Sequence, residues 1–115
     1  MHDSRIASRY AKSLIELAQE RNVLDHVAHD MRSLAFISQQ NRQFVLMLKN
    51  PIINHERKLK VFEALFAGKV NEVSYSIFHL IARKKRESYL PDIAREFVRM
   101  YQDLKNIGQA TVVTT

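Results

Sequence analysis

The scarcity of glycine and proline is the feature that most constrains the fold of this chain. Only two glycines and two prolines occur in 115 residues, whereas sheet proteins need turn-forming residues at frequent intervals. The chain therefore favours helices joined by short polar connections. The same scarcity limits its chemistry. Gly68 and Gly108 lie too far apart for a glycine-rich phosphate loop, which excludes nucleotide binding by the P-loop or dinucleotide route.

Length and composition indicate one ordinary globular domain. The chain has 115 residues, of which 46% are hydrophobic, enough for a single core. No apolar run approaches the roughly 18 residues of a membrane span, and the first residues do not read as a secretory signal. The absence of cysteine excludes disulfides and thiolate metal sites and fits a reducing compartment. The net charge of +6 favours a polyanionic partner.

The apolar residues recur with a helical period six times, so we predict an all-α, single-domain six-helix bundle. The first three helices cover about residues 4–21, 23–40 and 42–49. Asn54 caps the fourth helix and Asn71 precedes the fifth. Ser88 caps the sixth, and Gly108 ends it. The fourth helix is expected to bury Leu59, Phe62, Leu65 and Phe66.

Three segments carry a combined signature: SRYAKSLIELAQE, NPIINHERKLKVFEALF and LIARKKRESYLPDIAREF. In this order and spacing they resemble the N-terminal domain of the delta subunit of F-type ATP synthases, the oligomycin-sensitivity-conferring protein (OSCP) of mitochondria. The matching positions are Tyr10, Ala11, Leu14, Asn50, Pro51, Leu80, Ile81, Arg86, Leu90, Pro91 and Ile93. Family members often have Asn-Gly where this chain has Lys84 and Lys85, which makes the corner before Arg86 more basic.

The resemblance implies a mechanical, non-catalytic role that needs no cofactor. A delta subunit joins the catalytic head to the peripheral stalk, so that the head cannot turn with the rotor during proton-driven ATP synthesis. Its N-terminal domain binds the N-terminal helix of an alpha subunit. The stalk b subunit is reached through a C-terminal domain that is absent here. Residues 1–108 would then be the helical domain. The tail at 109–115, whose QATVVTT reads as a strand, would open the missing part.

The same resemblance sets expectations for partners and location. A monomer is expected in isolation, with no nucleic-acid partner and with membrane contact only through the complex. Because no transit peptide is visible, the cytoplasmic side of a bacterial inner membrane is the expected place.

The resemblance places the alpha-binding groove between the first and fifth helices, a helix-in-groove mode of recognition. The residues carry an independent hint, because the first helix has a wider apolar stripe than one packing face needs. Tyr10 is the expected anchor, and a small Ser76 leaves room for a visiting helix. The bland alternative is that these residues only pack the core. The candidate groove residues are Ile6, Tyr10, Ser13, Leu14, Leu17, Val73, Ser76, Ile77 and Leu80.

The basic run Arg83, Lys84, Lys85 and Arg86 has two interpretations. It can complement the negative end of the fifth helix at a solvated corner, or it can contact phosphate or lipid headgroups. A small helical nucleic-acid-binding module using this run is the alternative function. A nucleic-acid reader normally spreads its basic side chains along one recognition helix, whereas this run is compact and followed by Glu87.

Histidines and acids give little support for catalysis or metal binding. His26, His29 and Asp30 have a spacing that can hold a metal, but no fourth ligand is evident and His29 and Asp30 are expected on the polar side. His55 is expected to serve at a helix start, and His79 has no carboxylate partner nearby in sequence. No nucleophile, base and orienting group can be assembled, so an enzyme is not expected.

Overall fold

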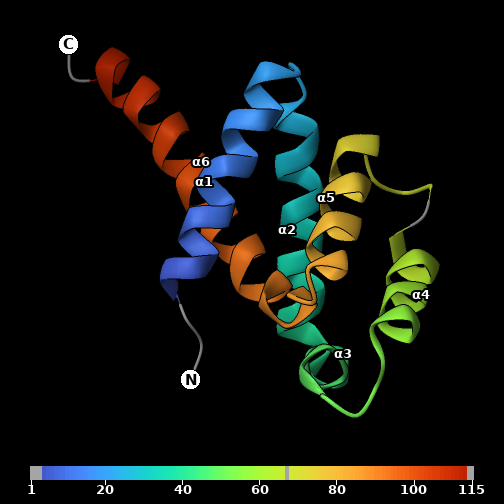
Figure 1. Ribbon diagram of the computed structural model, residues 1–115. Coiled ribbons are helices and arrows are strands. Elements are labelled where there is room, and N and C mark those ends of the chain that lie inside the picture. The colour runs from blue at the N-terminus through green and yellow to red at the C-terminus, as the bar shows by residue number, and fades with distance from the viewer. Residues whose placement is uncertain (1–3, 67, 114–115) are drawn as a thin grey trace.

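The computed structural model describes residues 4–66 and 68–113, and it describes side chains for 5–66 and 68–106. Within that part of the chain the structure is all α-helical, as predicted (Figure 1). The helices are α1 (Ser4–Glu20), α2 (Leu24–Gln40), α3 (Arg42–Lys49), α4 (His55–Phe66), α5 (Glu72–Arg83) and α6 (Leu90–Val113), with a 3-10 turn, η1 (Glu87–Tyr89), before α6.

Asparagines cap three of the helices, and the sequence predicts two of these starts, at Asn54 and Asn71. The side chain of Asn41 accepts a hydrogen bond from the Phe44 amide at 3.0 Å. The Asn54 side chain accepts from the Arg57 amide at 2.8 Å, and the Asn71 side chain accepts from the Val73 amide at 2.8 Å. Each bond satisfies one of the amide groups that a helix start leaves without a partner.

Three details of the predicted helices are wrong. Helix α6 continues through Gly108 to Val113, so Gly108 does not end it, and residues 109–113 of the tail are helical instead of forming the predicted strand. One glycine costs a helix only about 1 kcal/mol. Ser88 lies inside η1 rather than capping α6. Leu65 is 37% exposed, because the face of α4 toward the bundle carries Phe62 and Phe66 and buries Lys58 instead.

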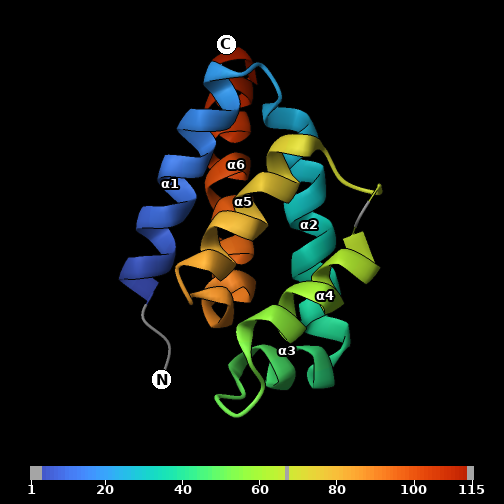
Figure 2. The ribbon, with the colours of Figure 1, turned by 45° about the vertical axis from the view of Figure 1, so that its right-hand side comes forward.

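Helices α1 and α2 both pack chiefly on α6. The side of α1 toward the core carries three alanines, Ala7, Ala11 and Ala18, all fully buried. Such small side chains let two helix backbones approach closely, so α1 lies tight against α6. Figure 2 shows α6 behind, with α1 and α2 on either side and α5 between them in front.

An aromatic cluster joins the other half of the bundle. Phe62 of α4 lies 5.5 Å from Phe44 of α3 and 5.6 Å from Phe78 of α5, measured between ring centroids. Phe66 completes the cluster, 5.5 Å from Phe78. Aromatic pairs at these distances add to the free energy gained from burial, and this cluster fixes α4 against α5.

Polar contacts tie α6 to both of its neighbours. Ser8 of α1 donates to Glu96 at 2.8 Å, and Tyr101 of α6 donates to Asp25 of α2 at 2.6 Å. The Arg99 hydrogen bond, with Ser8 in support, lowers the pKa of the Glu96 carboxyl below its ordinary value. Hydrogen bonds from Tyr101 and Lys105 likewise lower the pKa of Asp25.

Candidate functional site

Helix α1 presents two adjacent stripes, which accounts for the width of its apolar pattern. One stripe, Ala7, Ala11, Leu14 and Ala18, is buried in the core. Each residue of the other stripe directly precedes a residue of the buried stripe in sequence, and this second stripe points toward α5. Its members line two hollows: Ile6, Tyr10 and Ser13 line the first, and Leu17 lines the second.

Helix α5 supplies the opposite wall. Its residues Val73, Ser76, Ile77 and Leu80 line the second hollow together with Leu17 of α1. Ile77 is only 2% exposed and forms the floor, whereas Leu80 is 44% exposed. A leucine nearly half exposed beside a small Ser76 leaves apolar surface at the rim of the hollow available to another molecule.

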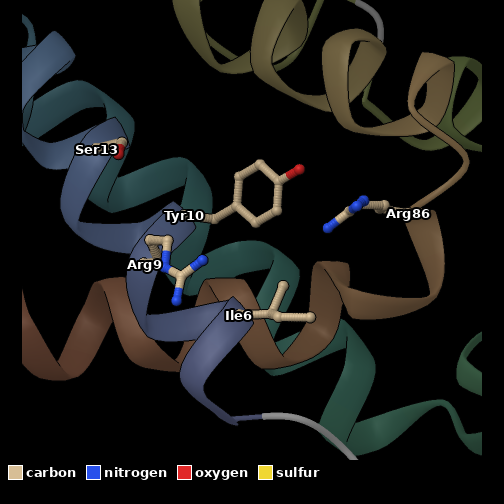
Figure 3. Close-up of a pocket in the computed structure, with 5 residues that line it drawn as sticks. All are labelled: Ile6, Arg9, Tyr10, Ser13 and Arg86. Carbon is tan, nitrogen blue, oxygen red and sulfur yellow. The ribbon is translucent and has the colours of Figure 1, made fainter.

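The two hollows lie along α1, and together we call them the α1/α5 groove. The first is lined by Ile6, Arg9, Tyr10, Ser13 and Arg86, and Figure 3 shows Tyr10 projecting between α1 and the corner that follows α5. Their volumes are about 200 and 250 Å³, below the roughly 300–1,000 Å³ of typical small-molecule sites. They suit protruding side chains of a partner better than an enclosed metabolite.

The direction of the two walls follows from the lining residues. The N-terminal half of α1 meets the corner after α5 in the first hollow, and Leu17 and Arg21, near the end of α1, meet the start of α5 in the second. The walls are therefore antiparallel. Eight of the nine candidate groove residues line this groove. Leu14 does not; it is 5% exposed and lies in the core.

The basic run forms the corner between α5 and η1. The backbone turns through Lys85, whose φ is +61°. The Lys85 amide bonds to the Ala82 carbonyl at 2.9 Å, and the Arg86 amide bonds to the Ile81 carbonyl at 3.0 Å. This is a Schellman ending, which usually places glycine at the left-handed position. All four basic side chains are exposed, but only Arg86 reaches the groove, with its guanidinium 5.9 Å from the Tyr10 ring centre.

A buried ion pair beneath this corner was not predicted. Lys58 of α4 and Glu87 of η1 are each 3% exposed, and they meet at 3.0 Å. The Lys58 ammonium also donates to the Leu48 carbonyl at 2.8 Å, and His55 lies 2.7 Å from Glu87. The one sequence signal was an isolated acid directly after four basic residues, which does not reveal burial.

Asp30 was also misplaced by the sequence prediction. It is 4% exposed and accepts hydrogen bonds from the Asn71 amide at 2.8 Å and the Ser74 hydroxyl at 2.6 Å. It therefore holds the start of α5 onto α2, instead of facing solvent beside His29. Among the described residues no group of three His, Cys, Asp or Glu side chains could hold a metal ion.

His79 has a carboxylate neighbour that sequence distance concealed. Its Nε2 lies 3.7 Å from Glu63 of α4, and Tyr75 donates to the same carboxylate at 3.1 Å. Burial and this acceptor raise the pKa of Tyr75. These contacts lie between α4 and α5, so they position the α5 wall and do not line the groove.

No helix in the described ranges has the length and apolarity needed to cross a membrane.

A family model described as ATP synthase delta (OSCP) subunit matches residues 6–115. ATP synthase subunit delta of Cytophaga hutchinsonii is 43% identical over 115 residues, covering 100% of this chain and 63% of that protein. The same-named protein of Amoebophilus asiaticus is 34% identical over 96% of this chain and 60% of its own length.

A third relative, ATP synthase subunit delta of Flavobacterium psychrophilum, is 35% identical over 114 residues, which are 99% of this chain and 64% of the relative. The chain thus spans less than two thirds of the length of these curated relatives.

Proposed function

The chain belongs to the ATP synthase delta (OSCP) family, and from this premise we propose that it is a non-catalytic stator adaptor. In this proposal the α1/α5 groove holds the amphipathic N-terminal helix of an alpha subunit. The rest of the subunit, beyond a helical domain at residues 1–108, would reach the peripheral stalk b subunit. The complex would lie at the cytoplasmic side of a bacterial inner membrane.

The observation that carries the proposal is that both walls of the groove carry apolar side chains. Tyr10, Leu17, Val73 and Leu80 are all at least partly exposed. Tyr10 lines the first hollow of the groove, and Leu17 of α1 lines the second together with Val73 and Leu80 of α5. An amphipathic helix laid between them would bury its i, i+3, i+4 and i+7 side chains. Burial of such apolar area is the main driving force of this kind of association.

The nucleic-acid alternative is not supported by the matches described above, each of which names an ATP synthase subunit. The geometry also disfavours it. Of the basic run, only Arg86 lines either hollow of the α1/α5 groove, and the four side chains share one corner instead of one helix face. Arg83, Lys84 and Lys85 are therefore best assigned to a solvated corner.

The test is a titration of the isotope-labelled protein with a synthetic peptide of the cognate alpha subunit's N-terminal helix, followed by amide NMR shifts. We expect saturable shifts confined to α1, α5 and the corner. Ser76→Trp should weaken binding at least about tenfold, because the indole would fill the space beside Leu80. Gln39→Trp, at an exposed position on α2, is the matched control and should bind like the wild type. Absence of saturable shifts on α1 and α5 would contradict the adaptor role.

A further inference from the structure

The two ends of the α1/α5 groove differ in charge. The hollow at the Tyr10 end carries two cations, Arg9 and Arg86, and no acid among the described residues lines it. The hollow at the other end carries one of each sign, Arg21 and Glu72. The groove is therefore positive at one end and balanced at the other, and this asymmetry is fixed by helices that are packed on the core.

Arg9 and Arg86 also differ from the arginines of α6. Arg95 pairs with Asp92, and Arg99 pairs with Glu96 at 2.8 Å and Asp103 at 3.3 Å. Within the ranges that the structure describes, Arg9 and Arg86 pair with no carboxylate. Figure 3 shows Arg86 extending from the corner toward the Tyr10 ring, with Arg9 next to Tyr10 on α1.

The Arg86 guanidinium lies over the Tyr10 ring, 5.9 Å from its centre, within the range of a cation–π interaction. A guanidinium in this position leaves the N–H groups at its edge free to bind a carboxylate. Ile6 and Tyr10 supply the apolar wall beside these donors. The hollow thus combines two cations with a surface that suits an aliphatic stem.

We propose that this end of the groove recognises an acidic side chain of the docked helix, whose carboxylate binds between Arg9 and Arg86. The acid marks one end of the helix's apolar stripe and so sets its register and direction in the groove. Arg21, directly after α1, lies twelve positions beyond Arg9, or about 18 Å along the helix. The acid therefore lies about three turns from the side chains that meet Arg21 and Glu72. This inference rests on the proposed function.

A carboxylate on a protein helix fits better than a phosphate or a nucleic acid. Of the residues that the structure describes, two cations line the hollow, and the other lining residues are Ile6, Tyr10 and Ser13. A polyanion would engage the exposed corner residues Arg83, Lys84 and Lys85 as well, which lie outside the hollow. A bound helix carboxylate should therefore depend on Arg9 and Arg86 alone, whereas a bound polyanion should depend on Arg83, Lys84 and Lys85 as well.

The experiment measures the dissociation constant of the alpha-subunit N-terminal peptide for the wild type, Arg9→Gln, Arg86→Gln and the control Arg83→Gln. Arg83→Gln removes the same charge from the same corner but outside the groove. Each measurement is repeated with peptides in which each acidic residue in turn is replaced by its amide. We expect Arg9→Gln and Arg86→Gln to weaken binding about two- to fivefold each, with no loss for Arg83→Gln.

Coupling identifies the acid. The peptide that lacks the bound acid should have a dissociation constant for the wild type that is raised by about the same factor as the arginine substitutions cause. With that peptide, Arg9→Gln and Arg86→Gln should then cause little further loss of affinity. Raising NaCl from about 0.05 to about 0.5 M should weaken the native peptide more than that amide peptide. The inference is overturned if the peptide binds the groove while the arginine variants match the wild type, if Arg83→Gln costs as much, or if no acid couples to either arginine. Loss of binding by the wild type itself would instead contradict the proposed function.

Discussion

At the scale of single residues, Lys85 sits in a backbone conformation that suits another amino acid. Its φ of +61° places it in the left-handed region, where a side chain with a Cβ is strained by about 1 kcal/mol or more. Asn22, at the end of α1, has a similar φ of +58°, but asparagine tolerates this region. The corner after α5 therefore carries local strain that the end of α1 largely avoids.

We predict that Lys85→Gly raises the free energy of unfolding by about 0.5–1 kcal/mol, because the relief of strain exceeds the added entropy of the unfolded chain. Lys84→Gly removes the same charge at a residue whose φ is −82° and should lower the free energy of unfolding instead. Urea denaturation of both variants measures the difference. Equal changes in the two variants would show that charge, and not backbone conformation, governs the corner.

At the scale of helices, the buried Lys58–Glu87 pair joins the end of α3, the second turn of α4 and the turn before α6. Removing one partner of a buried ion pair leaves the other charge without compensation, which typically costs 3–5 kcal/mol. We predict that Lys58→Met lowers the free energy of unfolding by about 3 kcal/mol, since His55 still contacts Glu87 and softens the loss.

Two further variants test that assignment by urea denaturation. Adding Glu87→Gln to Lys58→Met should restore more than half of the lost free energy, because the uncompensated charge is gone. Lys60→Met, at an exposed position on the same helix, should stay within about 0.5 kcal/mol of the wild type. Equal free energies of unfolding for Lys58→Met and Lys60→Met would contradict the conclusion that Lys58 and Glu87 stabilise each other as a buried ion pair.

At the scale of the whole molecule, acid stability depends on carboxyls that tie α6 to its neighbours. The pKa of Glu96 is lower in the folded protein than its ordinary value of 4.5. A carboxyl whose folded pKa is lowered contributes stability above its unfolded pKa and loses that contribution as the pH falls through its folded pKa. The bundle should therefore lose stability below about pH 4.5.

We predict that Glu96→Gln lowers the free energy of unfolding at pH 7 by about 0.5 kcal/mol, a small value because the site is partly exposed. The difference from the wild type should begin to shrink as the pH falls below about 4.5, the ordinary pKa, and should vanish once the pH has passed through the lowered pKa of folded Glu96. Thermal or urea unfolding across this range provides the measurement. Glu16→Gln, for an exposed acid on α1, should show no such convergence. If the difference in the free energy of unfolding between the wild type and Glu96→Gln stays constant with pH, Glu96 is not a source of the pH dependence of stability.

Much of the fold followed from local patterns, because helix period and asparagine caps act over a few residues. The six helices and the starts at Asn41, Asn54 and Asn71 were predictable for that reason. The buried roles of Asp30 and Lys58 were not, because their partners lie 41 and 29 residues away in sequence. The separation of the α1 stripe into core and groove faces also depends on where α5 lies.

Contacts between residues far apart in sequence were also unpredictable at the end of the groove where Tyr10 and Arg86 lie. Both residues were named from sequence, one as a groove anchor and one in the basic run. Nothing in their spacing of 76 positions indicates that the guanidinium lies over the ring. Arg9, a neighbour in the same hollow, was not named at all, because an exposed arginine on a helix carries no distinguishing pattern.

The antiparallel walls of the α1/α5 groove have a mechanical consequence. The two walls are anchored separately, α1 on α6 and the start of α5 on α2 through Asp30, so packing within the bundle sets the width of the groove. A helix lying along the groove and pulled along its own axis would load every side-chain contact at the same time, in shear. A pull across the groove would instead peel the contacts apart one turn after another. An elongated groove of this kind therefore resists force best along its length.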